Sequence, residues 1–296
     1  MSPLAAPDCD AAPRSPGLPF LRAAPQMLRM VTPVPFQPRR FQSAAQHYLA
    51  GRPPYAERLI ALVAERCRLR RADRLLDLGC GPGQLAVAFA PLVGTVVAID
   101  PEPEMRRIAA ESAAAADVTI EVVAGSSYDL GSHLGRFRLV TIGRAFHWMD
   151  RIDTLRQLAE IVEPDGAIAL FGDDHPKLPD NRWRRDYQAL VERYSEGDAV
   201  RAFVKSPDWI RHEAVLLDSP FATLERIGVI ERRRTSIDRL IDRALSMSSS
   251  SPERLGPRAA DLVGELRALL SGVAVDGLVT EVIESEALIA RRAEAT

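Results

Sequence analysis

The sequence predicts an α/β protein built on a parallel sheet that carries helices on both faces. Three observations support this fold class. Short apolar strands alternate with helices of about ten residues from position 74 onward, as in parallel sheets. A glycine-rich loop at residues 79–83 joins the first strand to a helix, and Asp100 ends the second strand. Right-handed crossovers bring such strand ends to one edge of the sheet, where ligands bind.

The parallel part of the sheet is predicted element by element from periodicity and from Pro and Gly breaks. Two helices, over residues 41–49 and 55–67, precede the sheet. The predicted strands cover residues 74–78, 95–99, 118–123, 138–142 and 167–171. The predicted helices between them cover residues 84–92, 103–114 and 152–162, and a Pro-Asp-Gly turn at 164–166 precedes the fifth strand.

The C-terminal third is less regular. It favours one domain with a helical insertion after the fifth strand over two separate domains. The predicted helices cover residues 183–194, 236–245 and 258–270, and the predicted strands cover residues 222–232 and 278–290.

Composition excludes several classes of function. A formal charge of −2 over 296 residues offers no electrostatic basis for binding nucleic acid or an acidic membrane surface. No apolar run approaches the ~18 residues of a membrane span. The three cysteines have neither metal-ligand spacing nor a disulfide framework, which is typical of a cytoplasmic protein.

Residues 1–40 are rich in proline, alanine, serine and arginine, a composition that predicts a disordered leader. The segment lacks the continuous apolar core of a secretory signal. A transit peptide and an over-extended gene start, with Met27 or Met30 as the initiator, both remain open interpretations.

The spacing of the glycines narrows the ligand. A dinucleotide-binding loop has its third glycine one residue later, at the position that Gln84 occupies, and the lysine-containing phosphate loop is also absent. The loop therefore predicts binding of a nucleoside without a pyrophosphate. This argues against a nicotinamide oxidoreductase.

The acid, apolar residue and G-x-G-x-G run formed by Asp77, Gly79, Gly81 and Gly83 resembles the first motif of class I S-adenosylmethionine-dependent methyltransferases. The resemblance implies a Rossmann-like sheet of seven strands whose last two form an antiparallel hairpin at the edge. It also implies a methyltransferase domain over residues 41–296, with a cofactor half at 41–171 and substrate helices and final strands at 172–296.

By the same resemblance, Asp100 accepts hydrogen bonds from the ribose hydroxyls of the cofactor. A cap for the helix that follows Pro101 is the structural alternative. Met105 matches the residue that packs on the adenine, although a methionine there is also typical of a core. The resemblance also implies that Asp77 organises the loop and receives the amino group of the methionine moiety, often through water.

Two more segments complete the predicted cofactor site. Ser126 and Ser127 stand where the family commonly has an acid, and Asp129 is a possible substitute. Upstream, Tyr48 and Arg52 resemble a pair that closes over the cofactor, with Arg52 binding its carboxylate unless it is an ordinary turn residue. The complete prediction for S-adenosylmethionine is Tyr48, Arg52, Asp77, Gly79, Cys80, Gly81, Gly83, Asp100, Pro101, Met105, Ser126, Ser127 and Arg144.

The substrate side follows the fourth strand. Phe146-His147-Trp148 resembles the trans-aconitate methyltransferase-like subgroup and is predicted to line the reaction chamber. His147 is the candidate catalytic base, because its unperturbed pKa lies near neutrality, and a structural histidine is the alternative. No spacing demands a metal, although Asp173, Asp174 and His175 follow the fifth strand.

The prediction is therefore a methyltransferase that moves a methyl group by in-line displacement to a small-molecule acceptor, most readily on oxygen. Residues 181–219 are expected to form the acceptor pocket and lid. A catalytically silent S-adenosylmethionine-binding protein of the same fold is the alternative from another class, because fold does not guarantee function.

Overall fold

The computed structural model describes residues 44–195 and 197–293. The predicted leader at 1–40 and the first residues of the predicted helix at 41–49 lie outside these ranges. No helix within them is long and apolar enough to cross a bilayer.

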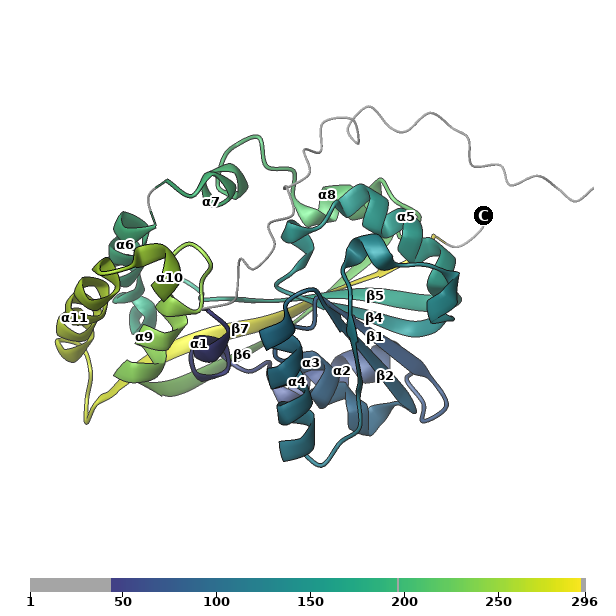
Figure 1. Cartoon of the computed structure of the whole chain (residues 1–296), viewed down its shortest axis with the longest axis horizontal. Helices are drawn as coiled ribbons and strands as arrows, with labels where there is room; N and C mark the ends of the chain where they lie inside the picture. The colour runs from purple at the N-terminus through teal and green to yellow at the C-terminus, as the bar shows by residue number, and fades with distance from the viewer. Residues whose placement is uncertain (1–43, 196, 294–296) are drawn as a thin grey trace, which may run out of the picture.

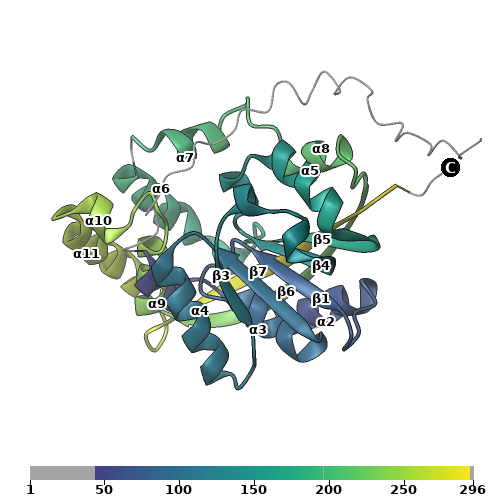
Figure 2. The same cartoon turned by 45° about the vertical axis from the view of Figure 1, so that its right-hand side comes forward.

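One sheet of seven strands runs through the described chain in the order β3-β2-β1-β4-β5-β7-β6 (Figures 1 and 2). Its strands are β1 (Arg74–Leu78), β2 (Thr95–Asp100), β3 (Glu121–Ala124), β4 (Phe137–Gly143), β5 (Val162–Asp174), β6 (Thr223–Ser236) and β7 (Leu278–Arg291). Strands β1 to β5 are parallel, whereas β7 is antiparallel to both β5 and β6. This arrangement confirms the predicted Rossmann-like fold class with its antiparallel edge.

Helices cover both faces of the sheet, as the alternation of strands and helices predicted. The helices before and between the parallel strands are α1 (Ala45–Gly51), α2 (Glu57–Arg66), α3 (Gln84–Phe89), α4 (Pro103–Ala115) and α5 (Arg151–Ile161). The helices after β5 are α6 (Arg184–Tyr194), α7 (Ala199–Val204), α8 (His212–Leu217), α9 (Ile237–Leu245), α10 (Pro252–Leu255) and α11 (Arg258–Ser271).

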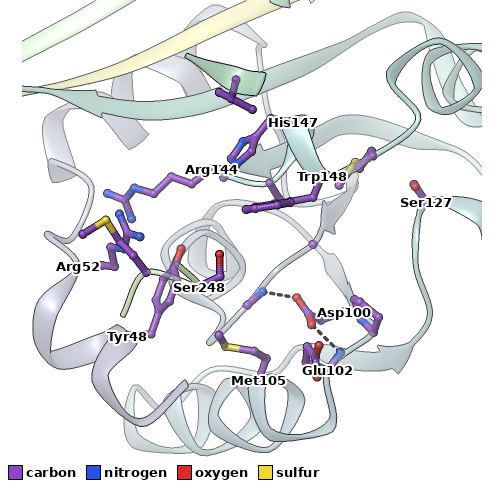
Figure 3. Close-up of a pocket in the computed structure, with 18 of the residues that line it drawn as sticks. Tyr48, Arg52, Asp100, Glu102, Met105, Ser127, Arg144, His147, Trp148 and Ser248 are labelled. Carbon is purple, nitrogen blue, oxygen red and sulfur yellow. Dashed lines mark hydrogen bonds between the residues drawn. The ribbon is translucent and has the colours of Figure 1, made fainter. Parts of the chain in front are cut away.

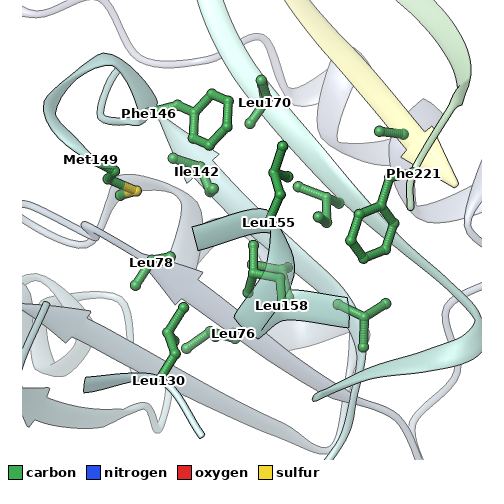
Figure 4. Packing of buried hydrophobic residues seen from close by; sticks show 14 of the residues in the cluster. Leu76, Leu78, Leu130, Ile142, Phe146, Met149, Leu155, Leu158, Leu170 and Phe221 are labelled. Carbon is green, nitrogen blue, oxygen red and sulfur yellow. The ribbon is translucent and has the colours of Figure 1, made fainter. Parts of the chain in front are cut away.

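The two faces have separate apolar cores, because successive strand side chains point to opposite sides. On one face Leu76 and Ile142 of the strands pack against Leu155 and Leu158 of α5 and against Phe221 (Figure 4). On the other face, neighbouring strand residues pack against α2 and α3. This two-sided burial holds the carboxyl ends of β1, β2 and β4 together at one edge.

A third cluster lies beyond the parallel strands, where α6, α9 and α11 gather over the far end of β6 and β7 (Figure 1). Here Tyr187 of α6 packs with Leu240 of α9 and Leu266 of α11. The helical insertion predicted after the fifth strand is therefore confirmed. A second group of helices separates β6 from β7, so the final antiparallel pair is not joined by a short turn.

Four strands agree with the prediction to within one residue, whereas β3, β5 and β6 differ. Strand β6 ends at Ser236, four residues later than expected. Strand β3 begins at Glu121, three residues later than expected. The predicted turn at 164–166 lies inside β5, as a break in register: Val162 pairs with Phe137, and Ala167 with Leu139. Gly166 permits this, because a Cβ there would lie 2.9 Å from the carbonyl oxygen of Arg138.

Candidate active site

A cavity of about 560 Å³ opens at the carboxyl ends of the parallel strands (Figure 3). It is lined by residues from α1, the glycine loop, the ends of β2, β4 and β5, helix α7 and the loop after α9. Among the predicted site residues, those on the cavity wall are Tyr48, Arg52, Gly79, Gly81, Asp100, Pro101, Met105, Ser126, Ser127, Arg144, His147 and Trp148.

The glycine loop has a left-handed backbone at all three glycines, with φ of 68° at Gly79, 53° at Gly81 and 83° at Gly83. A Cβ at Gly79 would lie 2.9 Å from the Cβ of Ala145, whereas at Gly81 its nearest neighbour would be the sulfur of Met105 at 4.0 Å. Gly81 therefore faces open space. Glycine suits the loop for two reasons: its backbone adopts the left-handed conformation without strain, and the missing side chain leaves room for a ligand.

Cys80 and Gly83 do not line the cavity. Cys80 is buried, and burial raises the pKa of its thiol. Gly83 precedes α3, and a Cβ there would lie 3.1 Å from the Cβ of Ala109 on α4. Both residues shape the loop from behind.

Asp100 fastens this loop to the start of α4 (Figure 3). Its two carboxylate oxygens accept the backbone N–H of Gly81 at 2.8 Å and that of Glu102 at 2.9 Å. Burial is the largest influence on this carboxyl and raises its pKa. Each oxygen keeps a second lone pair, so the carboxylate can still accept ligand hydroxyls. The capping position of α4 is Glu102, not Asp100.

Asp77 lies behind the loop, only 1 % exposed and away from the cavity wall. It accepts hydrogen bonds from the Thr141 hydroxyl at 2.9 Å and from the Ala86 N–H at 3.0 Å. Burial outweighs these bonds and raises its pKa to about 7. The carboxyl therefore ties the start of α3 to β1 and β4.

The segment after β3 supplies Ser126, Ser127 and Tyr128 to the cavity wall. Asp129 is engaged locally, because its Oδ2 accepts both the hydroxyl of Ser126 at 2.9 Å and its backbone N–H at 2.8 Å. The suggested substitution of Asp129 for the missing acid is therefore not supported by its position.

Arg144 is held by internal contacts, although it lines the cavity. Its Nε donates to Asp173 Oδ1 at 2.5 Å, its Nη2 donates to the Pro53 carbonyl at 3.0 Å, and its guanidinium stacks 4.4 Å from the centre of the Tyr55 ring. Burial opposes ionisation of Asp173, but the charges of Arg144 and Arg52 outweigh it and lower its pKa to about 2. Arg144 therefore braces the residues before α2 against the end of β5.

Arg52 differs from Arg144 in having a buried donor left over. Its guanidinium lies 5.4 Å from the centre of the Tyr48 ring. Within the described ranges, Arg52 Nε and Arg184 Nη1 are the buried side-chain nitrogens that have no hydrogen-bond partner. A buried donor without an acceptor is costly, so Arg52 is suited to an anionic ligand group.

The segment after β4 separates its three predicted substrate residues. His147 and Trp148 line the cavity with their rings 4.6 Å apart. Phe146 instead lies in the hydrophobic core, 3 % exposed and 5.1 Å from the ring of His212. The prediction that Phe146 faces the chamber is wrong. The short 3₁₀ turn over Phe146–Trp148 directs consecutive side chains about 120° apart, so one of the three points inward.

The wall includes three residues of the segment 181–219, which was expected to form the acceptor pocket and lid: Arg201, Val204 and Lys205. It also contains residues that no sequence motif indicated, namely Glu102, Tyr128, Met247, Ser248 and Ser249. Arg201 Nη1 donates to the hydroxyl of Ser249 at 3.3 Å, which joins α7 to the loop after α9. A run of serines after an amphipathic helix was the available signal for this loop, since such a run ends a helix without adding apolar surface.

The possible metal ligands after β5 are not assembled into a site. His175 Nε2 lies 3.2 Å from Glu281 Oε2, and Asp173 pairs with Arg144. Across residues 44–195 and 197–293, no group of three or more His, Cys, Asp or Glu side chains is placed to hold a metal ion.

Comparison with known proteins agrees with this geometry. The family described as "Methyltransferase domain" matches residues 75–166, which span β1 to β5. An uncharacterized methyltransferase of Mycobacterium tuberculosis is 28% identical over 232 residues, covering 77% of this chain and 85% of that protein. A ubiquinone biosynthesis O-methyltransferase of Xanthomonas campestris is 34% identical over 110 residues, 36% of this chain and 46% of the other.

Among solved structures, YjhP of E. coli superposes with a TM-score of 0.51 at 16% identity, covering 86% of this chain and 100% of that one. A predicted type II methyltransferase of Anaeromyxobacter dehalogenans gives a TM-score of 0.53 at 17% identity, with 81% and 97% covered. These likenesses concern the fold. Placement in the trans-aconitate methyltransferase-like subgroup stays a prediction. The strand order, the glycine loop, the match of residues 75–166 to the methyltransferase domain family and the methyltransferase relatives together support a class I S-adenosylmethionine-dependent methyltransferase.

Proposed function

We propose that this methyltransferase acts on the oxygen of a small-molecule acceptor. The observation that supports the proposal is the cavity at the carboxyl ends of the parallel strands, whose volume of about 560 Å³ falls in the range of small-molecule sites. Its far wall is made by α7 and the serine loop after α9, so the acceptor is enclosed by the inserted helices.

The cavity residues fit S-adenosylmethionine. Gly79 and Gly81 admit the cofactor against the backbone, and the free lone pairs of Asp100 suit the ribose hydroxyls. The unpartnered Nε of Arg52 suits the carboxylate of the methionine moiety. Met105, which packs with Tyr48, offers an apolar surface for the adenine.

The remaining predicted cofactor residues act indirectly in this proposal. Asp77, Cys80 and Gly83 shape the loop from behind, and Arg144 braces the segment that carries Arg52. Ser126 and Ser127 contribute the polar edge of the cavity beyond β3.

S-adenosylmethionine supplies a methyl group on a sulfonium, an electrophile with a good leaving group. The chain contributes alignment of the acceptor and exclusion of water, which together lower the barrier of an in-line displacement. His147 lies on the cavity wall beside Trp148 and is proposed to take the proton from a hydroxyl acceptor.

Replacement of His147 tests this role. We expect His147→Ala to lower turnover by a factor of about 10² to 10⁴, the usual contribution of a general base, while cofactor affinity stays within about twofold. Turnover is followed as S-adenosylhomocysteine release with an acceptor found in a panel of phenols and hydroxy acids. Unchanged turnover would remove the catalytic role.

The first experiment is calorimetric titration of the purified chain with S-adenosylmethionine, S-adenosylhomocysteine and, as a control, NAD. The cofactor site is supported if S-adenosylmethionine and S-adenosylhomocysteine bind and NAD does not. Binding without product release from any acceptor in the panel supports the silent alternative, and absence of binding contradicts the proposal.

A further inference from the structure

We propose that α9, in the insertion between β6 and β7, positions α1 over the cofactor cavity, with Asp242 and Arg243 as positioning residues. The inference rests on the proposed role of Tyr48 and Arg52 in cofactor binding. It assigns a role to a helix that is remote from α1 in sequence, because Gly51 and Arg243, which are in contact, are 192 residues apart. Figure 1 shows α1 lying directly beside α9.

Polar contacts from α9 hold α1 along its length. Asp242 Oδ1 lies 2.8 Å from His47 Nδ1. At the end of α1, Arg239 Nε donates to the carbonyl of Ala50 at 3.0 Å, and Arg243 Nε donates to that of Gly51 at 3.1 Å. The last carbonyls of a helix lack partners within it, and cationic donors stabilise them. α9 therefore supplies the C-terminal cap that α1 lacks.

The two helices also touch backbone to backbone at Gly51. A Cβ at this position would lie 2.2 Å from the backbone nitrogen of Arg243 and 2.3 Å from the backbone carbon of Asp242. Neither atom can move without moving α9 itself. The glycine is thus required by close approach, which fixes the distance between the helices.

Arg243 connects this contact to the sheet. Its Nη1 and Nη2 donate to the two carboxylate oxygens of Glu281 at 2.6 and 2.9 Å, and Thr235 Oγ1 donates to Glu281 at 2.5 Å. Glu281 is fully buried in β7, at a position that pairs with Arg233 of β6. The guanidinium that caps α1 is therefore anchored to the β6–β7 pair.

The opposite side of α1 faces the cofactor cavity. Ala45 and Tyr48 pack against Met105 and Ile108 of α4, and Arg52 follows the last residue of α1 directly. A shift of α1 away from α9 would displace the Tyr48 ring from Met105 and the Arg52 guanidinium from the cavity wall (Figure 3). α9 consequently acts on the cofactor through these two side chains.

The test measures the Kd for S-adenosylhomocysteine by calorimetry in the full chain. Gly51→Ala should raise the Kd at least tenfold, because the added methyl group separates α1 from α9. Asp242→Ala, at a partly exposed side chain, should raise it about threefold to tenfold. If Gly51→Ala fails to fold, Asp242→Ala alone decides the outcome.

The matched control is Asp238→Ala. Asp238 lies on the same helix, but its carboxylate pairs with Arg267 of α11 at 2.7 Å and, among the described residues, not with α1. Its Kd should equal that of the wild type, and Tm should fall equally for the two aspartate variants. An equal rise in Kd for both variants would overturn the proposal, because it would show a general loss of helix stability.

A double-variant comparison separates positioning from a merely structural effect. Once Tyr48→Ala and Arg52→Ala remove the side chains through which α1 acts, Asp242→Ala should cause no further rise in Kd. If Asp242→Ala still raises the Kd by the same factor in that background, α9 does not act on the cofactor through Tyr48 and Arg52. If the wild-type chain binds no S-adenosylhomocysteine, the proposed function fails first, whereas wild-type Kd in both Gly51→Ala and Asp242→Ala refutes only the role of α9.

Discussion

The cofactor half and the C-terminal half of the molecule both bury carboxylates, but they give them different partners. Asp77 and Asp100, beside the glycine loop, accept hydrogen bonds from backbone N–H groups and one hydroxyl. Burial therefore dominates and raises both pKa values. Asp173 and Glu281 instead face Arg144 and Arg243, whose charges outweigh burial and lower the pKa of each acid.

The different partners indicate different roles for the two sets of carboxylates. In the C-terminal half the acids are neutralised by the protein itself, and they hold strands and helices together. Beside the glycine loop, backbone dipoles and, at Asp100, the half-buried Arg106 oppose the effect of burial on these two carboxylates without outweighing it. Under the proposed function, the negative potential there is left for a ligand that carries a sulfonium and an ammonium group.

Removing the charge of Glu281 should break the C-terminal arrangement and have the largest effect on stability. Glu281→Gln leaves the Arg243 guanidinium buried without a counter-charge, which we expect to lower the free energy of unfolding by about 3–5 kcal/mol. Urea denaturation at pH 7 measures it. Because the folded pKa of Glu281 lies below its unfolded value, the deficit should shrink as the pH falls below about 4. A deficit independent of pH would contradict the charge argument.

On the cofactor side, the corresponding change should affect binding more than folding. Gly81→Val adds a branched side chain at φ 53° in space that faces the cavity. We expect the Kd for S-adenosylhomocysteine to rise about 100-fold, equivalent to about 3 kcal/mol, measured by calorimetry. Valine is strained at this left-handed φ, so Tm should fall. Circular dichroism should still show the fold, because the nearest atom to a Cβ there is 4.0 Å away. Retained affinity would mean that the ligand lies elsewhere.

The two halves should also respond to pH with opposite signs. The folded pKa of Asp77, about 7, lies above the unfolded value near 3.9, so its carboxyl lowers stability as the pH rises between these values. Asp77→Asn removes this titration. Relative to wild type, the variant should gain about 2–3 kcal/mol between pH 5 and pH 8 in denaturation experiments. A constant difference across this range would show that the pKa is not raised.

The smallest effect is expected at an exposed ion pair of the C-terminal half. Glu286 pairs with Arg226 across β6 and β7, as Glu281 pairs with Arg243, but both side chains reach solvent. Glu286→Gln should therefore lower the free energy of unfolding by less than about 1 kcal/mol. A loss close to that of Glu281→Gln would show that burial is not what distinguishes the two pairs.

Local sequence accounts well for the cofactor half. The strand at Arg74–Leu78, the loop glycines and the strand that ends at Asp100 were predictable, because apolar periodicity and glycine spacing act over a few residues. In the C-terminal third, periodicity also indicated α6, α9, α11, β6 and β7, but not the short helices α7, α8 and α10 individually. What followed from the sequence is the set of elements, their order and the edge of the sheet where the site lies.

The tertiary structure decided which side chains reach that site. It turned Phe146 into the core, engaged Arg144 with Asp173, and brought the serine loop to the cavity wall. It also placed α9 on α1, through contacts between residues far apart in the chain. Such contacts depend on how whole elements pack, and no short-range pattern in the sequence encodes the partner across the fold.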